Sequence, residues 1–117
     1  MGTQNVALFA FNGDPMCLIH VLLNALNMKQ KGYNIKIIIE GSATKLIPEF
    51  TKDGSPLKPL YLKAEKQGLV EGACKACSNK MGTLEAAKAQ GFVLLDDMSG
   101  HPSMSRYMDA GYKVISF

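Results

Sequence analysis

Short apolar runs alternate along the chain with longer stretches in which apolar residues recur every three or four positions. The runs predict strands at 6–11, 34–40, 68–73, 92–95 and 112–117. The periodic stretches predict helices at 15–31, 44–50, 60–67 and 103–110, and one more between the Cys74–Cys77 pair and Gly91. Strands that alternate with helices are typical of an α/β fold with a parallel sheet and helices on both faces.

Ligands of such a sheet bind beyond the carboxyl ends of its strands. Four loops are expected at that edge, namely 12–15, 41–42, 74–77 and 96–102. The Pro/Gly-rich segment 53–59 is too short to separate two domains, but it is long enough to form a mobile lid. We therefore expect one domain that spans residues 1–117.

The composition narrows the class of protein. A chain of 117 residues with 47% hydrophobic and 20% charged residues suits one globular core. The net charge of +3 comes from scattered lysines, which argues against a nucleic-acid partner. No apolar run is long enough to span a membrane, and the first residues lack both a basic leader and a myristoylation pattern. A cytoplasmic protein is expected, and its odd number of three cysteines argues against a disulfide framework.

Two thiols stand where the third predicted strand ends and a helix begins, in Cys74-Lys75-Ala76-Cys77. Free backbone N–H groups and the helix dipole at that point favour a thiolate, and Lys75 and Lys80 add positive charge. The expected chemistry is sulfur chemistry or metal binding, although small buried cysteines that only pack are the plain alternative.

The helix pattern also predicts which thiol reacts. Met81, Leu84 and Ala87 form one apolar stripe, and the position four residues before Met81 is Cys77. This places Cys77 toward the sheet and leaves Cys74 as the exposed nucleophile.

Other candidate residues carry weaker signals. Cys17 and His20 lie three positions apart on the first helix and, with the CxxC pair, would complete four zinc ligands. Because the sequence around Cys17 is apolar, a packed core cysteine is the favoured interpretation, and neither a metal nor a cofactor is predicted. His101 precedes the last short helix and is placed to orient or protonate a sulfur substrate, although an ordinary loop histidine fits equally well. Asp96 and Asp97 are interpreted as solvated.

The pattern Cys74-x-x-Cys77-x-x-Lys80-x-Gly82 after a third strand resembles the DsrE/DsrF-like family, which includes the TusD sulfur-relay subunits and the YchN-like proteins. Gly82 lies eight residues after Cys74, as the family motif requires, and the ending from Gly100 to Phe117 is also similar. The resemblance implies a three-layer α/β/α domain with a five-stranded, mostly parallel sheet. It also implies a homo-oligomer, often a trimer or hexamer, and persulfide transfer on Cys74. The second cysteine, Cys77, departs from the relay subunits.

The leading functional hypothesis is a sulfur carrier or sulfurtransferase-like protein that holds persulfide sulfur on Cys74 between a donor and an acceptor protein. A dithiol redox protein that uses Cys74 and Cys77 is the second hypothesis. A non-enzymatic metal-binding or regulatory module is the third, and a small-ligand binder with incidental thiols is the fourth.

Overall fold

The computed structural model describes residues 4–117. Residues 1–3, on which the predictions about a leader and a myristoylation pattern partly fall, lie outside the described residues. The elements are, in order, β1 (Asn5–Ala10), α1 (Pro15–Gln30), β2 (Asn34–Ile39), the 3-10 helix η1 (Gly41–Thr51), α2 (Leu57–Lys66), β3 (Val70–Cys74), α3 (Lys75–Lys80), α4 (Leu84–Ala89), β4 (Leu94–Leu95), α5 (Met104–Asp109) and β5 (Lys113–Ser116). None of the helices within 4–117 has the length and apolar character needed to cross a membrane.

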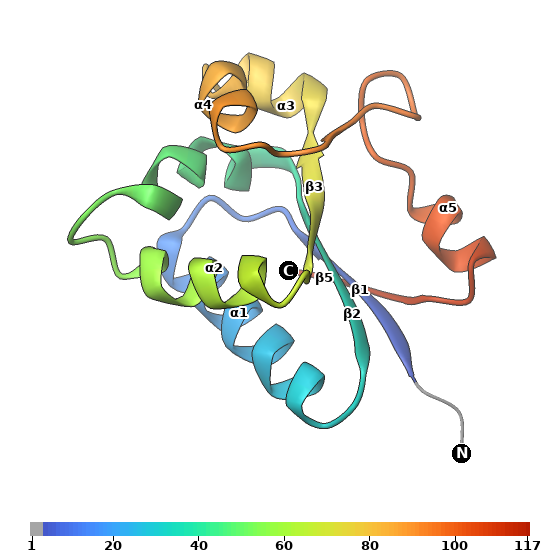
Figure 1. Ribbon diagram of the computed structural model, residues 1–117. Coiled ribbons are helices and arrows are strands. Elements are labelled where there is room, and N and C mark those ends of the chain that lie inside the picture. Colours follow the sequence, from blue (N-terminus) through green and yellow to red (C-terminus); the bar gives the residue numbers. More distant parts are fainter. Residues whose placement is uncertain (1–3) are drawn as a thin grey trace.

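The five strands form one parallel sheet in the order β4-β3-β2-β1-β5. Figure 1 shows α1 and α2 on one side of this sheet and α5 on the other, with α3 and α4 beyond the end of β3. The α/β fold with three layers and a five-stranded parallel sheet is therefore confirmed. Because β2, β3 and β4 are neighbours, the residues that follow their carboxyl ends meet at one place.

Local signals fix the first helix where the sequence predicts it. The Asp14 carboxylate accepts a hydrogen bond from the Met16 N–H at 2.9 Å, and Pro15 occupies the first helical position. The chain leaves the helix at Gly32, whose φ of +95° is readily adopted only by glycine. These caps define α1 within one residue of the predicted bounds.

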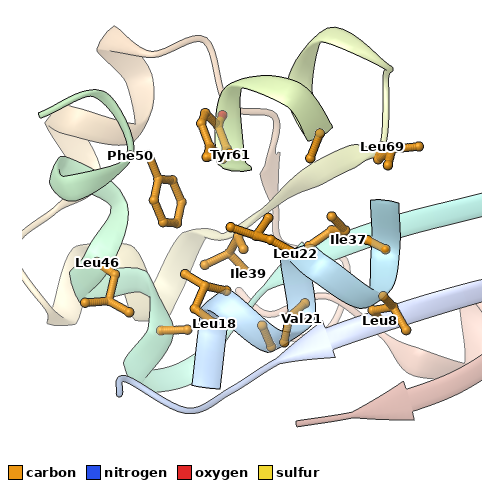
Figure 2. Packing of buried hydrophobic residues seen from close by; sticks show 14 of the residues in the cluster. Leu8, Leu18, Val21, Leu22, Ile37, Ile39, Leu46, Phe50, Tyr61 and Leu69 are labelled. Carbon is orange, nitrogen blue, oxygen red and sulfur yellow. The ribbon is translucent and has the colours of Figure 1, made fainter. Parts of the chain in front are cut away.

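The core lies mainly between the sheet and the α1/α2 layer. Figure 2 shows how side chains from the two helical elements meet those of the strands, with Leu22 of α1 beside Ile37 and Ile39 of β2. The opposite face carries a smaller buried cluster that consists of Ala7, Phe9, Ile38, Leu95 and Tyr107. The sheet is thus thickly covered on one face and thinly covered, by α5, on the other.

Two predicted helices differ from the structure. The segment predicted as a helix at 44–50 is the longer 3-10 helix η1, which contains Pro48. Helix α2 begins at Leu57, three residues before the predicted start, and Leu57 is buried in the core. The second half of the segment 53–59 is therefore part of a packed helix. This segment does not line the pocket at the cysteines.

The predicted helix between the CxxC pair and Gly91 is two short helices, α3 and α4. Gly82 separates them with a φ of +75°, a left-handed conformation that ends a helix. As a result Met81 does not continue the apolar stripe, and its side chain is 39% exposed.

Candidate functional site

The two cysteines of the motif have different surroundings. Cys74 ends β3 and caps α3, where its sulfur accepts a hydrogen bond from the Cys77 N–H at 3.3 Å. Its side chain is fully buried. Cys77 lies in the first turn of α3, is partly exposed and lines a pocket. The prediction that Cys74 is the exposed thiol and Cys77 the sheltered one is therefore wrong.

This reversal has a local cause. The predicted orientation of Cys77 relied on one continuous helix with Met81 on its buried stripe, whereas the helix ends before Gly82. In α3 the buried side chain is that of Ser78, whose hydroxyl donates to the Cys74 carbonyl at 2.7 Å. Cys77 consequently faces the pocket and not the sheet.

Two further side chains meet the thiols. The Cys77 sulfur lies 3.2 Å from Glu40 Oε1 and 3.6 Å from His101 Nδ1. The same His101 nitrogen is 3.1 Å from the Cys74 sulfur and 3.7 Å from Glu40 Oε1. The four ligand-type atoms all lie within 4.8 Å of one another. We call these four residues the strand-end cluster.

The loop after β4 holds His101 in place through backbone hydrogen bonds. The Ala76 N–H donates to the Gly100 carbonyl at 2.9 Å, which ties the loop to the first turn of α3. Met98 and His101 exchange two backbone hydrogen bonds, at 2.7 and 2.9 Å. Gly100 has a φ of +90°, and a Cβ there would lie 3.2 Å from Ala76 Cβ. The close fit of this loop against α3 sets the position of the imidazole.

The electrostatic environment of the strand-end cluster disfavours thiolates. Burial is the main cause that raises the pKa of the Cys74 thiol, and Glu40 raises it further, although the hydrogen bond from the Cys77 N–H lowers it. Burial and Glu40 likewise raise the pKa of Cys77. Lys75, expected to favour a thiolate, instead lies 3.7 Å from Asp96 in an ion pair. The prediction of a thiolate at the start of α3 is therefore wrong. Burial and the Glu40 carboxylate raise the pKa of Cys74 by more than the hydrogen bond from the Cys77 N–H lowers it.

An open pocket of about 560 Å³ leads to the strand-end cluster. Cys77, Glu40 and His101 lie in its wall together with apolar side chains that include Phe9, Phe11, Met98 and Met104. Three of the four predicted loops, 41–42, 74–77 and 96–102, contribute residues to this wall. The loop 12–15 does not line the pocket. The site is thus a polar cluster at the end of a mostly apolar recess.

The other sequence candidates lie apart from the strand-end cluster. Cys17 and His20 are on α1, and within residues 4–117 neither joins a group of potential metal ligands. The four-ligand set that combined them with Cys74 and Cys77 is therefore wrong. The Asp97 carboxylate accepts from the Ser103 N–H at 3.3 Å, so it has a local capping contact.

Sequence reasoning missed Glu40. It follows the run Ile37-Ile38-Ile39 at the carboxyl end of β2, and it is only 5% exposed. An acidic residue directly after an unbroken run of three isoleucines, at the edge where ligands bind, is the signal that would have identified it.

Comparisons with known proteins give relatives but no activity. No model of a known protein family matches the chain, and no solved structure matches it. An uncharacterized protein of Archaeoglobus fulgidus is 39% identical over 61 residues, which are 52% of this chain and 98% of that protein. The uncharacterized protein MJ0733 of Methanocaldococcus jannaschii is 34% identical over 98 residues, which are 84% of this chain and 78% of that protein. Because this second match covers most of both sequences, the chain belongs to the same protein family as MJ0733.

Proposed function

We propose that the protein carries persulfide sulfur on its Cys74–Cys77 pair and delivers it to an acceptor thiol. The observation that supports this most directly is the placement of Cys77 in the wall of the pocket, with Cys74 buried behind it and one imidazole nitrogen within 3.6 Å of both sulfurs. The resemblance of the motif to the DsrE/DsrF-like family is the second support, and membership in that family is part of the proposal.

His101 supplies the base that this chemistry needs. A thiol whose pKa is raised must lose its proton before it attacks, and a histidine within hydrogen-bonding reach can accept it. The Cys77 proton passes to His101 Nδ1, and the thiolate attacks the outer sulfur of a donor persulfide. A new S–S bond forms at Cys77 as the donor S–S bond breaks, and the donor leaves as a thiolate with the bonding electron pair.

The buried partner then stores the sulfur. The departing donor thiolate first takes the proton from His101 Nδ1, which frees the imidazole. The Cys74 thiol then loses its proton to this nitrogen and attacks the outer sulfur of the Cys77 persulfide, so that the sulfur moves to Cys74 and the Cys77 thiolate leaves and takes the proton from His101. Burial shields the stored persulfide from water and oxidants. Delivery runs through the same two exchanges in reverse, and it ends when an acceptor thiolate takes the outer sulfur from Cys77.

Mass spectrometry of the intact reduced protein tests this proposal. The protein is treated with a chelator and then with cysteine persulfide as the donor. We expect one added sulfur atom per chain in the wild type and in Cys17→Ser, and a loss of most of it in Cys77→Ser. If the wild type gains no sulfur while an unrelated thiol protein does, or if Cys77→Ser loads as fully as the wild type, the proposal fails.

A dithiol redox protein is the second candidate, because both sulfurs belong to a cluster whose atoms lie within 4.8 Å of one another. The Cys74→Ser variant separates the two functions. A sulfur carrier keeps loading on Cys77, whereas a dithiol oxidoreductase loses its activity because the Cys74–Cys77 disulfide cannot form. A disulfide reduction assay with this variant, beside the loading assay, decides between them.

The setting of the protein is also proposed from the sequence. We propose a cytoplasmic homo-oligomer, a trimer or hexamer, that meets separate donor and acceptor proteins. The odd cysteine count supports a reducing compartment, and the motif resemblance supports the assembly. Light scattering coupled to size-exclusion chromatography measures the mass of the assembly, and a monomer at micromolar concentration would exclude both states.

A further inference from the structure

We infer that the strand-end cluster is a zinc site, with Cys74, Cys77, His101 and Glu40 as its four ligands. This goes beyond the proposed sulfur transfer and does not rest on it. It also differs from the metal set expected from the sequence, because Glu40 and His101 take the places of Cys17 and His20.

The distances within the strand-end cluster are close to those between the ligand atoms of a tetrahedral zinc ion. Zinc binds sulfur at about 2.3 Å and nitrogen or oxygen at about 2.0–2.1 Å, so the ligand atoms of a tetrahedral site are about 3.3–3.8 Å apart. Four of the six ligand–ligand distances here are 3.1, 3.2, 3.6 and 3.7 Å. The remaining two, from Cys74 to Cys77 and to Glu40, are within 4.8 Å. The four known distances lie within about 0.2 Å of the tetrahedral range.

The types of ligand atom select the metal. Two sulfurs, one imidazole nitrogen and one carboxylate oxygen favour zinc, whereas magnesium and calcium prefer oxygen ligands alone. The four ligands come from three neighbouring strand ends and the first turn of α3. Hydrogen bonds such as that from the Ala76 N–H to the Gly100 carbonyl fix the loop that carries His101. The ligands are therefore held close together by the fold itself, and the pocket gives an entry path.

Metal binding by the purified, reduced, metal-stripped chain tests the inference. Zinc is titrated in competition with a chromophoric zinc indicator, and we expect one zinc ion per chain. Cobalt(II) serves as the spectroscopic probe, for which we expect thiolate-to-metal absorption in the near ultraviolet and the intense visible bands of a tetrahedral site. Less than half a zinc ion per chain at saturation, or a weak octahedral cobalt spectrum without thiolate bands, would overturn the inference.

Variants then identify the ligands. His101→Gln and Glu40→Gln should each weaken zinc binding at least about tenfold, and Cys77→Ser should abolish the thiolate band of the tetrahedral cobalt complex or shift and weaken it. Cys17→Ser and His20→Gln are the matched controls and should bind zinc as the wild type does. Circular dichroism of each variant confirms that it is folded. Wild-type affinity in folded His101→Gln and Glu40→Gln, or loss of binding in the Cys17 or His20 variants, would show that zinc binds elsewhere. The zinc titration contains no sulfur donor and the sulfur assay contains chelator, so either proposal can fail alone.

Discussion

The substitution Glu40→Gln should make the Cys77 thiol more reactive at alkaline pH. Glu40 Oε1 lies 3.2 Å from the Cys77 sulfur, and its negative charge opposes formation of the thiolate. At 3.2 Å Coulomb's law gives a repulsion of about 1.3 kcal/mol with the dielectric constant of water and about 5 kcal/mol with an effective value of 20. Because Glu40 is buried whereas Cys77 faces an open pocket, the smaller figure is a lower bound on the repulsion.

The expected effect on rate follows from this energy. A gain of about 1.3 kcal/mol for the thiolate raises its fraction about tenfold at any pH well below the pKa of the thiol. Alkylation by iodoacetamide depends on that fraction, so its rate should rise at least about tenfold. The assay uses chelator-treated protein in a Cys17→Ser background, in which Cys77 is the reachable thiol because Cys74 is buried. An unchanged or slower rate in folded Glu40→Gln would refute the electrostatic reasoning, and Glu85→Gln, on the exposed side of α4, is the matched control.

The remaining predictions concern stability. Leu22→Ala should lower the free energy of unfolding by about 2–5 kcal/mol, because Leu22 is only 1% exposed. Leu23→Ala should lower it far less, because Leu23 is 46% exposed. Urea denaturation measures both changes. Asp14→Ala removes the N-cap of α1 and should cost about 1 kcal/mol in the same assay, and Asp14→Asn should recover most of it. Burial raises the pKa of Tyr61 to about 12, so the folded state keeps this phenol proton after the unfolded chain has lost it. The free energy of unfolding should therefore fall as the pH rises from about 10 to about 12, by up to about 2.7 kcal/mol from this group, and Tyr61→Phe should remove that part of the fall.

The parts of the fold that the sequence predicts well depend on local signals. Asp14, Pro15 and Gly32 cap α1 through contacts within a few residues, and the five apolar runs mark the strands. Each of these features depends only on residues close to it in the sequence. The order of elements and the α/β class can therefore be inferred without the structure.

The orientation of the thiols could not be inferred in the same way. It depended on whether one helix or two follow Cys74, and the apolar stripe that suggested one helix is interrupted at Gly82. Gly82 followed by Thr83 is a signal for the end of one helix and the start of another. The helical spacing of Met81, Leu84 and Ala87 favoured one continuous helix instead, so this signal was overlooked. Met81 is therefore not part of a buried stripe, and the orientation predicted for Cys77 from Met81 does not hold.

The composition of the strand-end cluster depends on strand order, which no local pattern encodes. Glu40 and His101 are 61 positions apart, yet they meet because β3 lies between β2 and β4. Had another strand separated β2 from β3, Glu40 would lie at least one strand spacing of about 4.8 Å farther from the thiols. The motif identifies the cysteines, whereas only the topology identifies their partners.

Glu40 lies close to both the Cys77 thiol and the His101 imidazole, so its negative charge has two opposed effects on the reactivity of Cys77. The balance between these two effects depends on pH. At alkaline pH the Cys77 proton goes to solvent, and Glu40 only repels the thiolate at 3.2 Å. At lower pH the proton passes to His101, and Glu40 then attracts the imidazolium at 3.7 Å by about 1.1 kcal/mol in the dielectric of water, nearly equal to the repulsion of about 1.3 kcal/mol. The rate enhancement in Glu40→Gln should therefore shrink from about tenfold toward unity as the pH falls. If the enhancement is the same across the pH range, His101 does not hold the proton, and the base in the proposed sulfur transfer must be sought elsewhere.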